Sequence, residues 1–177
     1  MVGAGILPIA IYNNKLHFLF GKENQNEKSA PGFSDFGGHV EMGETIYEGA
    51  LRECAEELTG FYGNKHTLRK TIQNSGGVYK IIHDDYHTHA FLTEYDENLP
   101  KYFNRNHKYL WNETGGSYDV HLFEKIEIRW FTVDELRSNR HIFRNFYRGI
   151  VDEILQQERE ITSHLKKKNK LITQMSI

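Results

Sequence analysis

The stretch that decides the fold runs from residue 38 to residue 61 and reads GHVEMGETIYEGALRECAEELTGF. Thr45 and Glu48 have the spacing of a capping box, which predicts that a helix begins at Thr45. Gly60 is well placed to end this helix in a left-handed conformation. Between the two ends, apolar residues recur at helical spacing and predict one buried face: Tyr47, Ala50, Leu51, Cys54 and Leu58. The stretch therefore predicts a loop, a helix and a second loop.

Three glutamates fall on one face of this expected helix. Glu53, Glu56 and Glu57 have the i, i+3 and i+4 spacing that brings side chains together on an α-helix. Like charges this close destabilise a helix unless a cation lies among them. Mg²⁺ and Mn²⁺ are the natural candidates, since hard cations prefer oxygen ligands. A solvated acidic face is the alternative that these three residues alone leave open.

The same stretch resembles the signature of the Nudix hydrolases. That signature is a Gly, five residues, a Glu, seven residues, and then Arg-Glu-aliphatic-any-Glu-Glu-any-Gly-aliphatic. The chain departs from it at the end, because Thr59 stands where the signature has Gly and the glycine follows at Gly60. We expect one extra helical residue there, which would shift the exit loop and leave the glutamates in place. The residues that match without a gap are Gly38, Glu44, Arg52, Glu53, Cys54, Glu56 and Glu57.

The resemblance implies roles for these residues. Gly38 would add its carbonyl oxygen to the metal site, and Glu44 and Arg52 would form an ion pair that fixes the loop against the helix. The implied chemistry is hydrolysis of a diphosphate linkage by water, in which metal ions neutralise phosphate oxygens and lower the pKa of a bound water. Glu56 or Glu57 could also polarise that water, and the sequence does not separate ligand from base. The implied ligands of Mg²⁺ or Mn²⁺ are Glu53, Glu56 and Glu57.

A fourth carboxylate, Glu124, precedes a strand expected at residues 126–132. Several Nudix enzymes, RNA-decapping members among them, carry an extra carboxylate on the loop before this last strand. Glu124 is similarly placed, and it could be a further ligand or a general base. Glu127 is the competing choice, and a solvent-facing strand glutamate is the plain alternative.

Several residues outside the signature are candidates for substrate contacts. Lys22 and Lys28 flank the approach to an expected Gly-Gly turn and could contact phosphates. Tyr79 lies near the place where dinucleoside polyphosphate hydrolases carry a tyrosine. Its position is a weak indication of substrate.

Residues 95–124 are rich in aromatic and basic side chains. This segment is too long for an ordinary connection, so we expect a short helix or an ordered functional loop within it. Tyr109 and Trp111 are our candidates for stacking on a nucleobase. The alternative, which we favour for most of these rings, is that they pack the insertion onto the core.

The rest of the chain predicts strands around a few helices. Period-two patterns predict strands, the first two of them forming a hairpin, at residues 3–12, 16–21, 68–73, 78–83, 87–94 and 126–132. Thr132 and Glu135 repeat the capping-box spacing, and an amphipathic pattern predicts one long helix from residue 143 to residue 165. The expected fold is α/β, a Nudix-like α/β/α sandwich with a mixed sheet and a long C-terminal helix.

Composition sets limits on organisation and partners. With 177 residues and 38% hydrophobic content, the chain predicts one domain, at residues 1–165, followed by a basic, flexible tail at 166–177. The formal net charge of -2 argues against a general nucleic-acid-binding surface. The single cysteine excludes an internal disulfide. We see neither a signal peptide nor a membrane-spanning run, and therefore expect a soluble, cytoplasmic protein without a membrane partner.

The function that the resemblance implies is a Mg²⁺- or Mn²⁺-dependent hydrolase. It would cleave the diphosphate linkage of a nucleoside diphosphate joined to another moiety, so the expected partner is a nucleotide-type small molecule. One alternative is an mRNA-decapping enzyme that releases m7GDP from capped RNA. Another is a catalytically inactive module that binds nucleotide or RNA. We expect Glu56→Gln and Glu57→Gln nearly to abolish turnover and, without metal, to leave the melting temperature largely unchanged.

Overall fold

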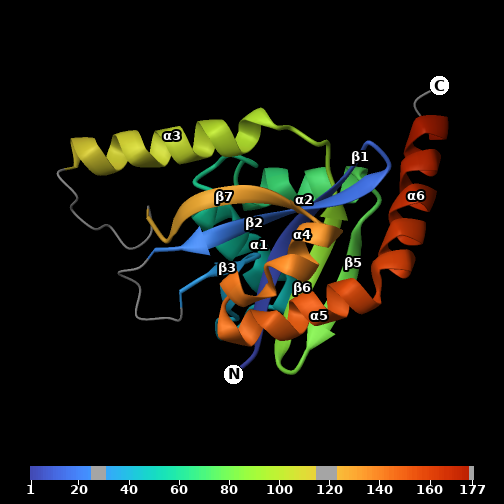
Figure 1. The fold of residues 1–177 in the computed structure, drawn as a ribbon, viewed down its shortest axis with the longest axis horizontal. Coiled ribbons are helices and arrows are strands. Elements are labelled where there is room, and N and C mark those ends of the chain that lie inside the picture. The colour runs from blue at the N-terminus through green and yellow to red at the C-terminus, as the bar shows by residue number, and fades with distance from the viewer. Residues whose placement is uncertain (25–30, 115–122, 176–177) are drawn as a thin grey trace.

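One mixed sheet forms the centre of the molecule (Figure 1). The computed structural model describes residues 1–24, 31–114 and 123–175, with side chains up to residue 168. Its strands are β1 (Gly3–Tyr12), β2 (Lys15–Glu23), β3 (Phe33–Ser34), β4 (Phe36–His39), β5 (Val78–His83), β6 (Tyr86–Leu92) and β7 (Lys125–Thr132). The order along the sheet is β3-β2-β1-β6-β5, while β4 pairs with β1 and β7 pairs with β2. The pair β1 and β6 is parallel and the other pairs are antiparallel.

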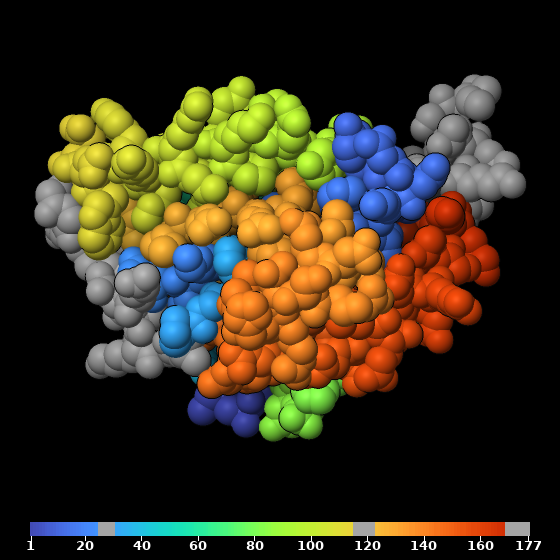
Figure 2. Space-filling model, viewed as in Figure 1, coloured from blue at the N-terminus to red at the C-terminus, as the bar shows by residue number. Residues whose placement is uncertain are grey.

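Helices cover both faces of this sheet, which confirms the predicted α/β/α sandwich. Apolar side chains of α1 (Ile46–Glu57), α2 (Lys65–Asn74) and α3 (Asn98–Glu113) enter the core on one face. The core on the other face is completed by α4 (Val133–Ser138), α5 (Arg148–Gln156) and α6 (Glu158–Met175). Figure 1 looks onto this second face, and Figure 2 shows α4, α5 and α6 closing over the sheet. In the described part of the chain, none of the helices has both the length and the apolar character needed to cross a membrane.

The strand β1 shows why both faces of the sheet are buried. Leu7 and Ile9 point into the core beneath α5, while Ile6 and Ala10 point into the core beneath α1. All four are fully buried. Side chains of a strand alternate between faces, so an almost continuous apolar run indicates a strand covered on both sides.

The predicted hairpin of β1 and β2 is confirmed. Asn13 and Asn14 connect the strands with φ values of 49° and 60°. A two-residue hairpin turn with both φ values positive matches the twist of the strands it joins, and Asn accepts this conformation readily. The two asparagines therefore set the register of the first two strands.

Both predicted capping boxes are confirmed. The Thr45 hydroxyl accepts a hydrogen bond from the Glu48 backbone N–H, and the Glu48 carboxylate accepts one from the Thr45 N–H. Thr132 and Glu135 make the same reciprocal contacts at the start of α4. Each box satisfies two backbone donors that the first helical turn leaves without a partner. For α1, this fixes the entry of the helix that carries the glutamates.

The strand expected at residues 68–73 is wrong, because these residues belong to the helix α2. Asn64 caps this helix by accepting hydrogen bonds from the backbone N–H groups of His66 and Thr67. Leu68 and Ile72, four residues apart, are buried on one helical face. The cap and this spacing outweigh the β-branched residues that suggested a strand.

The expected Gly-Gly turn and the expected single C-terminal helix also differ from the structure. Gly37 and Gly38 lie within β4 and pair with β1. The helix predicted from residue 143 to residue 165 begins only at Arg148, after a 3-10 turn at Asn145–Tyr147, and is interrupted at Gln157, which caps α5 before α6 begins. Residues 166–175, expected to form a flexible tail, continue α6. The division into a domain at 1–165 and a tail remains a prediction.

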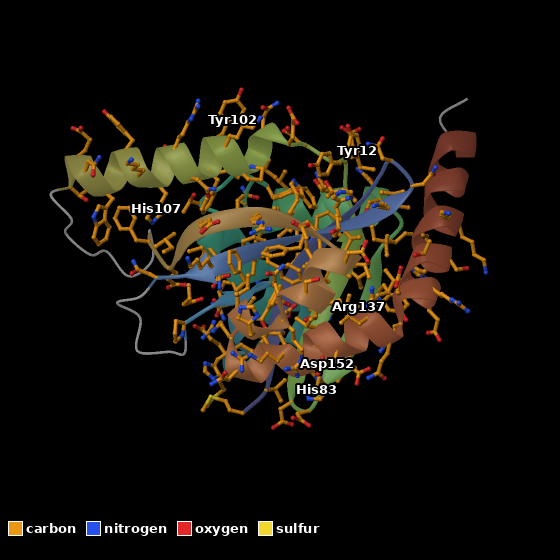
Figure 3. The ribbon with its side chains drawn as sticks, in the orientation of Figure 1. Tyr12, His83, Tyr102, His107, Arg137 and Asp152 are labelled. Atoms are coloured by element: carbon orange, nitrogen blue, oxygen red, sulfur yellow. The ribbon has the colours of Figure 1, made fainter. Side chains whose placement is uncertain are left out.

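The insertion at residues 95–124 contains α3, a helix of 16 residues and longer than expected. Figure 1 shows α3 crossing one edge of the molecule beside β7. Phe103 is buried, and Trp111 packs on the rings of His107 and Phe123. These rings pack the insertion onto the core, as we favoured. Figure 3 shows Tyr102 pointing away from the body of the molecule and His107 on the side of α3 that faces the sheet.

The end of α1 follows the Nudix signature more closely than the sequence suggests. We expected an extra helical residue after Glu57, but α1 ends at Glu57 and Leu58 is its C-cap. Thr59 has φ 47° and Gly60 has φ 85°. Thr59 therefore takes the left-handed conformation at the position where the signature has glycine, and no helical residue is added after Glu57.

Thr59→Gly is expected to stabilise the protein by roughly 1 kcal/mol, because a β-branched residue with positive φ is strained and glycine is not. Urea denaturation measures this gain. Thr114→Gly is the matched control, since Thr114 caps α3 with an ordinary φ of -83°. A loss of stability in Thr59→Gly, equal to that of the control, would contradict the strained conformation.

Candidate active site

A cavity of about 690 Å³ lies where β4, the end of α1 and the start of β7 meet. Its lining includes four residues that the sequence nominated: Gly38, Glu53, Glu57 and Glu124. His83 also lines it. In Figure 3, His83 lies at the edge of the molecule opposite α3. The cavity is therefore acidic and lies away from the solvent-facing side of the aromatic insertion.

Arg52 organises the outer part of the glutamate cluster. Its Nε and Nη2 atoms donate to both carboxylate oxygens of Glu44 at 3.0 and 3.1 Å. Its Nη1 atom donates to Glu53 at 2.9 Å and to Glu56 at 3.3 Å, and Nη2 also donates to the His39 carbonyl at 3.1 Å. The hydrogen bonds from Arg52 hold the pKa of Glu44 below its usual value. A bidentate contact of this kind fixes orientation, so one guanidinium ties the loop to α1.

Glu53 and Glu56 differ in position although both contact Arg52. The Glu53 side chain is 16% exposed and Glu56 is 47% exposed. The Glu53 carboxylate lies directly against Gly38, because a Cβ placed on Gly38 would come within 2.6 Å of Glu53 Oε1. Burial raises the pKa of Glu53, and the Arg52 hydrogen bond opposes this shift. Glu56 is not among the described lining residues of the cavity.

Glu57 is buried at the inner end of the cavity. Its Oε1 atom lies 3.2 Å from the Lys125 ammonium, while its buried Oε2 atom has no hydrogen-bond partner among the described residues. Burial raises the pKa of Glu57 well above its ordinary value; Lys125 opposes the shift, and Glu23 and Glu124 add to it. A buried carboxylate oxygen without a donor is costly. This oxygen is therefore suited to meet a cation.

Glu124 and Glu127, the two competing carboxylates, occupy different surroundings. Glu124 lines the cavity, and its charge acts on Glu57. Glu127 lies in β7, where its carboxylate is 3.7 Å from the Lys22 ammonium, and both side chains are more than a third exposed. Glu124 therefore lines the same cavity as Glu57, whereas Glu127 is not among its described lining residues.

The four substrate-contact candidates that the structure describes are not brought to this cavity. Lys22 pairs with Glu127, and Tyr79 donates from its hydroxyl to Gln157 and Glu160 on the opposite face of the sheet. Tyr109 is exposed on α3 and Trp111 packs on Phe123. None of these is among the described lining residues. Lys28 lies outside the described residues.

Sequence analysis missed two buried charges beside the glutamates. Lys125 Nζ lies 2.7 Å from Glu23 Oε2, and both side chains are buried. A lysine and a glutamate at strand ends look solvent-exposed in a sequence. Only the pairing of β2 with β7, which sets Glu23 opposite Lys125, brings them together. No local signal could have identified this pair.

Asp35 is a third missed group, fully buried beneath the cavity. Its carboxylate accepts hydrogen bonds from the Tyr86 hydroxyl at 2.6 Å and the Thr88 hydroxyl at 2.7 Å. Gly5 makes room for it, because a Cβ there would lie 2.5 Å from Asp35 Oδ2. Burial raises the pKa of Asp35 from 3.8 to about 6, although both hydroxyl donors oppose the shift. Tyr86 lines the cavity, so this network supports its wall.

Asp35 is expected to make stability depend on pH. Its folded pKa of about 6 exceeds its ordinary value of 3.8. Between these two pH values the Asp35 carboxyl group is protonated in the folded state and ionised in the unfolded state. The contribution of Asp35 to stability is therefore greatest below pH 4 and is lost as pH rises through 6, by roughly 2–3 kcal/mol at 1.36 kcal/mol per pKa unit. Urea denaturation of the wild type and of Asp35→Asn at pH 4 and 7 measures this. A difference between the two proteins that does not change with pH would contradict it.

The residues fit a hard divalent cation in their chemistry. As the side chains stand, the described part of the chain contains no group of three or more His, Cys, Asp or Glu residues ready to hold a metal ion. Glu53 and Glu57 nevertheless line one cavity, and the buried Oε2 atom of Glu57 has no hydrogen-bond partner among the described residues. Mg²⁺ is commonly held by one or two carboxylates, with waters and substrate phosphates completing its octahedron. Two carboxylates therefore suffice here.

Comparison with known proteins identifies the family of the chain. The family model of the NUDIX domain matches residues 3–154. The chain therefore belongs to the Nudix family, whose members are typically pyrophosphohydrolases that use divalent metal ions. No match was found among curated proteins.

Solved structures of Nudix proteins resemble this chain at low sequence identity. A protein of Listeria monocytogenes described as a NUDIX hydrolase is 15% identical, with a TM-score of 0.51, covering 92% of this chain and 97% of its own. The NUDIX domain of Shewanella oneidensis NrtR, solved with ADP ribose, is 11% identical, with a TM-score of 0.47 and coverage of 90% and 86%. An Ap4A hydrolase of C. elegans is 15% identical, with a TM-score of 0.42 and coverage of 86% and 93%.

Proposed function

We propose that the protein is a Mg²⁺- or Mn²⁺-dependent hydrolase that cleaves the diphosphate linkage of a nucleoside diphosphate joined to another moiety. The observation that carries this proposal is the cavity lined by Gly38, Glu53 and Glu57, in which the Oε2 atom of Glu57 is buried without a hydrogen-bond partner among the described residues. Membership in the Nudix family supports the reaction class. The binding of ADP ribose by the NrtR domain is consistent with a nucleotide substrate.

Each residue has a role in this proposal. Glu53 and Glu57, which line the cavity, would hold the divalent ion together with the Gly38 carbonyl oxygen. Glu56, next to Glu57 on α1 but outside the described lining of the cavity, would be a further ligand. The ion supplies charge neutralisation of the phosphate oxygens and activation of water. Arg52 keeps Glu53 aimed at Gly38 through its hydrogen bond.

Glu124 is the proposed group for orienting the attacking water. It lines the cavity together with Glu53 and Glu57, and its backbone carbonyl accepts a hydrogen bond from the Asn24 N–H at 2.8 Å. This contact ties the segment before β7 to the end of β2. A carboxylate on a segment anchored in this way can accept a proton from water.

Removal of the mRNA cap, releasing m7GDP from capped RNA, is the second candidate function. The observation that favours it is again Glu124, since decapping members of the family carry an extra carboxylate at the similar place. The aromatic residues of α3 do not strengthen it, because neither Tyr109 nor Trp111 is among the described lining residues. An inactive binding module is the remaining alternative.

A substrate panel separates these functions. It contains nucleotide sugars, dinucleoside polyphosphates, nucleoside triphosphates and capped RNA, each incubated with Mg²⁺ or Mn²⁺ and, as a control, with EDTA. We expect metal-dependent cleavage of a nucleoside-diphosphate-linked compound. Release of m7GDP alone would favour the decapping enzyme. Binding of a nucleotide without any turnover would contradict both enzymes and favour the inactive module.

A further inference from the structure

The ammonium group of Lys125 lies in an oxygen environment of the kind that holds metal ions. Its Nζ atom is 2.7 Å from Glu23 Oε2, 3.2 Å from Glu57 Oε1 and 3.1 Å from Ser34 Oγ. The Lys125 side chain is 0% exposed, and both glutamate side chains are at most 6% exposed. Carboxylate and hydroxyl oxygens that converge on one buried point form a cation site, and here the chain fills it with its own ammonium.

The fold is shaped to place Lys125 there. The pairing of β2 with β7 shifts register between Lys22 and Glu23, and this shift sets Glu23 opposite Lys125. Irregularities of this kind re-aim side chains near functional sites. Gly21 leaves room for the lysine stem, because a Cβ at Gly21 would lie 2.9 Å from Lys125 Cδ. Two separate features of the sheet therefore accommodate this one side chain.

This arrangement balances the charges at the inner end of the cavity. Arg144 donates from Nη1 to Glu23 Oε2 at 3.1 Å, so two buried cations face the two buried carboxylates of Glu23 and Glu57. Among the fully buried side-chain oxygens of this group, Glu57 Oε2 has no hydrogen-bond partner among the described residues. Glu57 Oε2 and the carboxylate of Glu53 therefore remain as ligands for a single divalent ion.

We propose that Lys125 is a built-in cation that occupies the place of a second divalent ion and limits the site to one metal ion per chain. It acts as a positioning residue, since it holds Glu57 Oε1 and thereby leaves Oε2 for the metal. It is not among the residues that line the cavity. This inference depends on the proposed function, because it assumes that Glu53 and Glu57 bind a divalent ion.

Titration with Mn²⁺, followed by electron paramagnetic resonance without nucleotide, tests the inference by counting bound ions. The wild type is expected to bind one Mn²⁺ per chain. Lys125→Ala removes the ammonium and opens its place, so two bound Mn²⁺ are expected. Lys125→Met keeps the stem and removes the charge, and it should bind the first Mn²⁺ at least about ten-fold more tightly, since a buried cation a few ångströms away repels the ion.

Lys65→Met is the matched control. Its ammonium lies 3.9 Å from Glu44 and its side chain is 42% exposed, so solvent screens its charge. We expect one Mn²⁺ and an affinity within about two-fold of the wild type. Two ions bound by the wild type would overturn the inference about Lys125 and leave the proposed function standing. Unchanged Mn²⁺ binding in Lys125→Met would also overturn it, even if Lys125→Ala did not fold. No bound Mn²⁺ in the wild type would overturn the proposed function as well.

Discussion

Glu53→Gln is expected to lower kcat by at least about 100-fold, which corresponds to roughly 3 kcal/mol of lost transition-state stabilisation. Glutamine keeps the shape of the side chain and one acceptor for Arg52, but it removes the negative charge that we propose as a metal ligand. The Glu53 side chain is partly exposed, so the free energy of unfolding should change by less than about 1 kcal/mol. Steady-state kinetics on the best substrate of the panel, with urea denaturation of the same protein, measure both quantities.

Glu97→Gln is the control for this prediction. Glu97 lies next to α3, and its side chain is 69% exposed where it pairs with Lys101. The same chemical change there should leave kcat and stability unchanged. If Glu53→Gln had the kcat of the wild type in saturating Mg²⁺, Glu53 would not belong to the catalytic site.

Glu57→Gln is expected to lower kcat to a similar extent, but its effect on stability should be larger. The sequence suggested that the melting temperature would not change. Glu57 is buried, however, and its carboxylate balances the charge of Lys125. Removing one partner of a buried pair leaves the other uncompensated, and because Glu23 remains beside Lys125, a loss of about 1–3 kcal/mol is expected.

Gly37→Ala is expected to lower the free energy of unfolding by roughly 3 kcal/mol or more, because its methyl group would overlap rigid backbone. A Cβ at Gly37 would collide with the Ala4 carbonyl oxygen and with Gly5 Cα on the neighbouring strand. Neither atom can move without breaking the pairing of β4 with β1. Urea denaturation and the yield of folded protein measure this effect.

Gly38→Ala is the matched comparison, one residue further along the same strand. Its Cβ would meet the Glu53 carboxylate, 2.6 Å from both Cδ and Oε1. A side chain can move where backbone cannot, so we expect a folded protein whose kcat falls at least about ten-fold because Glu53 is displaced. If both alanine variants had wild-type stability and kcat, the close approach of β4 to β1 and α1 would be contradicted.

The sequence predicted the elements that depend on local contacts. The capping box of Thr45 and Glu48 fixed the start of α1, and Asn13 and Asn14 fixed the first hairpin, because these signals act within a few residues. The ion pair of Glu44 and Arg52, which the resemblance to the Nudix signature implied, also spans a short distance in the sequence, about two helical turns and a short loop. The strand predicted at 68–73 is wrong because Asn64 caps a helix there, and Leu68 and Ile72 are buried on one face of that helix.

The buried part of the candidate site could not be predicted from the sequence. Glu23 and Lys125 are 102 positions apart, and only the pairing of β2 with β7 brings them together. Asp35 is likewise buried by distant strands, with hydroxyl donors more than 50 positions away. Such groups look solvent-exposed in a sequence because charged side chains usually are. Their importance follows from tertiary packing.

The most direct test of the account is to locate the metal. A crystal soaked with Mn²⁺ and a slowly hydrolysed nucleotide analogue should give an anomalous difference peak about 2 Å from carboxylate oxygens of Glu53 and Glu57. The diphosphate group of the analogue should lie beside that peak. A bound nucleotide without Mn²⁺ near Glu53 and Glu57, or Mn²⁺ bound elsewhere on the chain, would contradict the account.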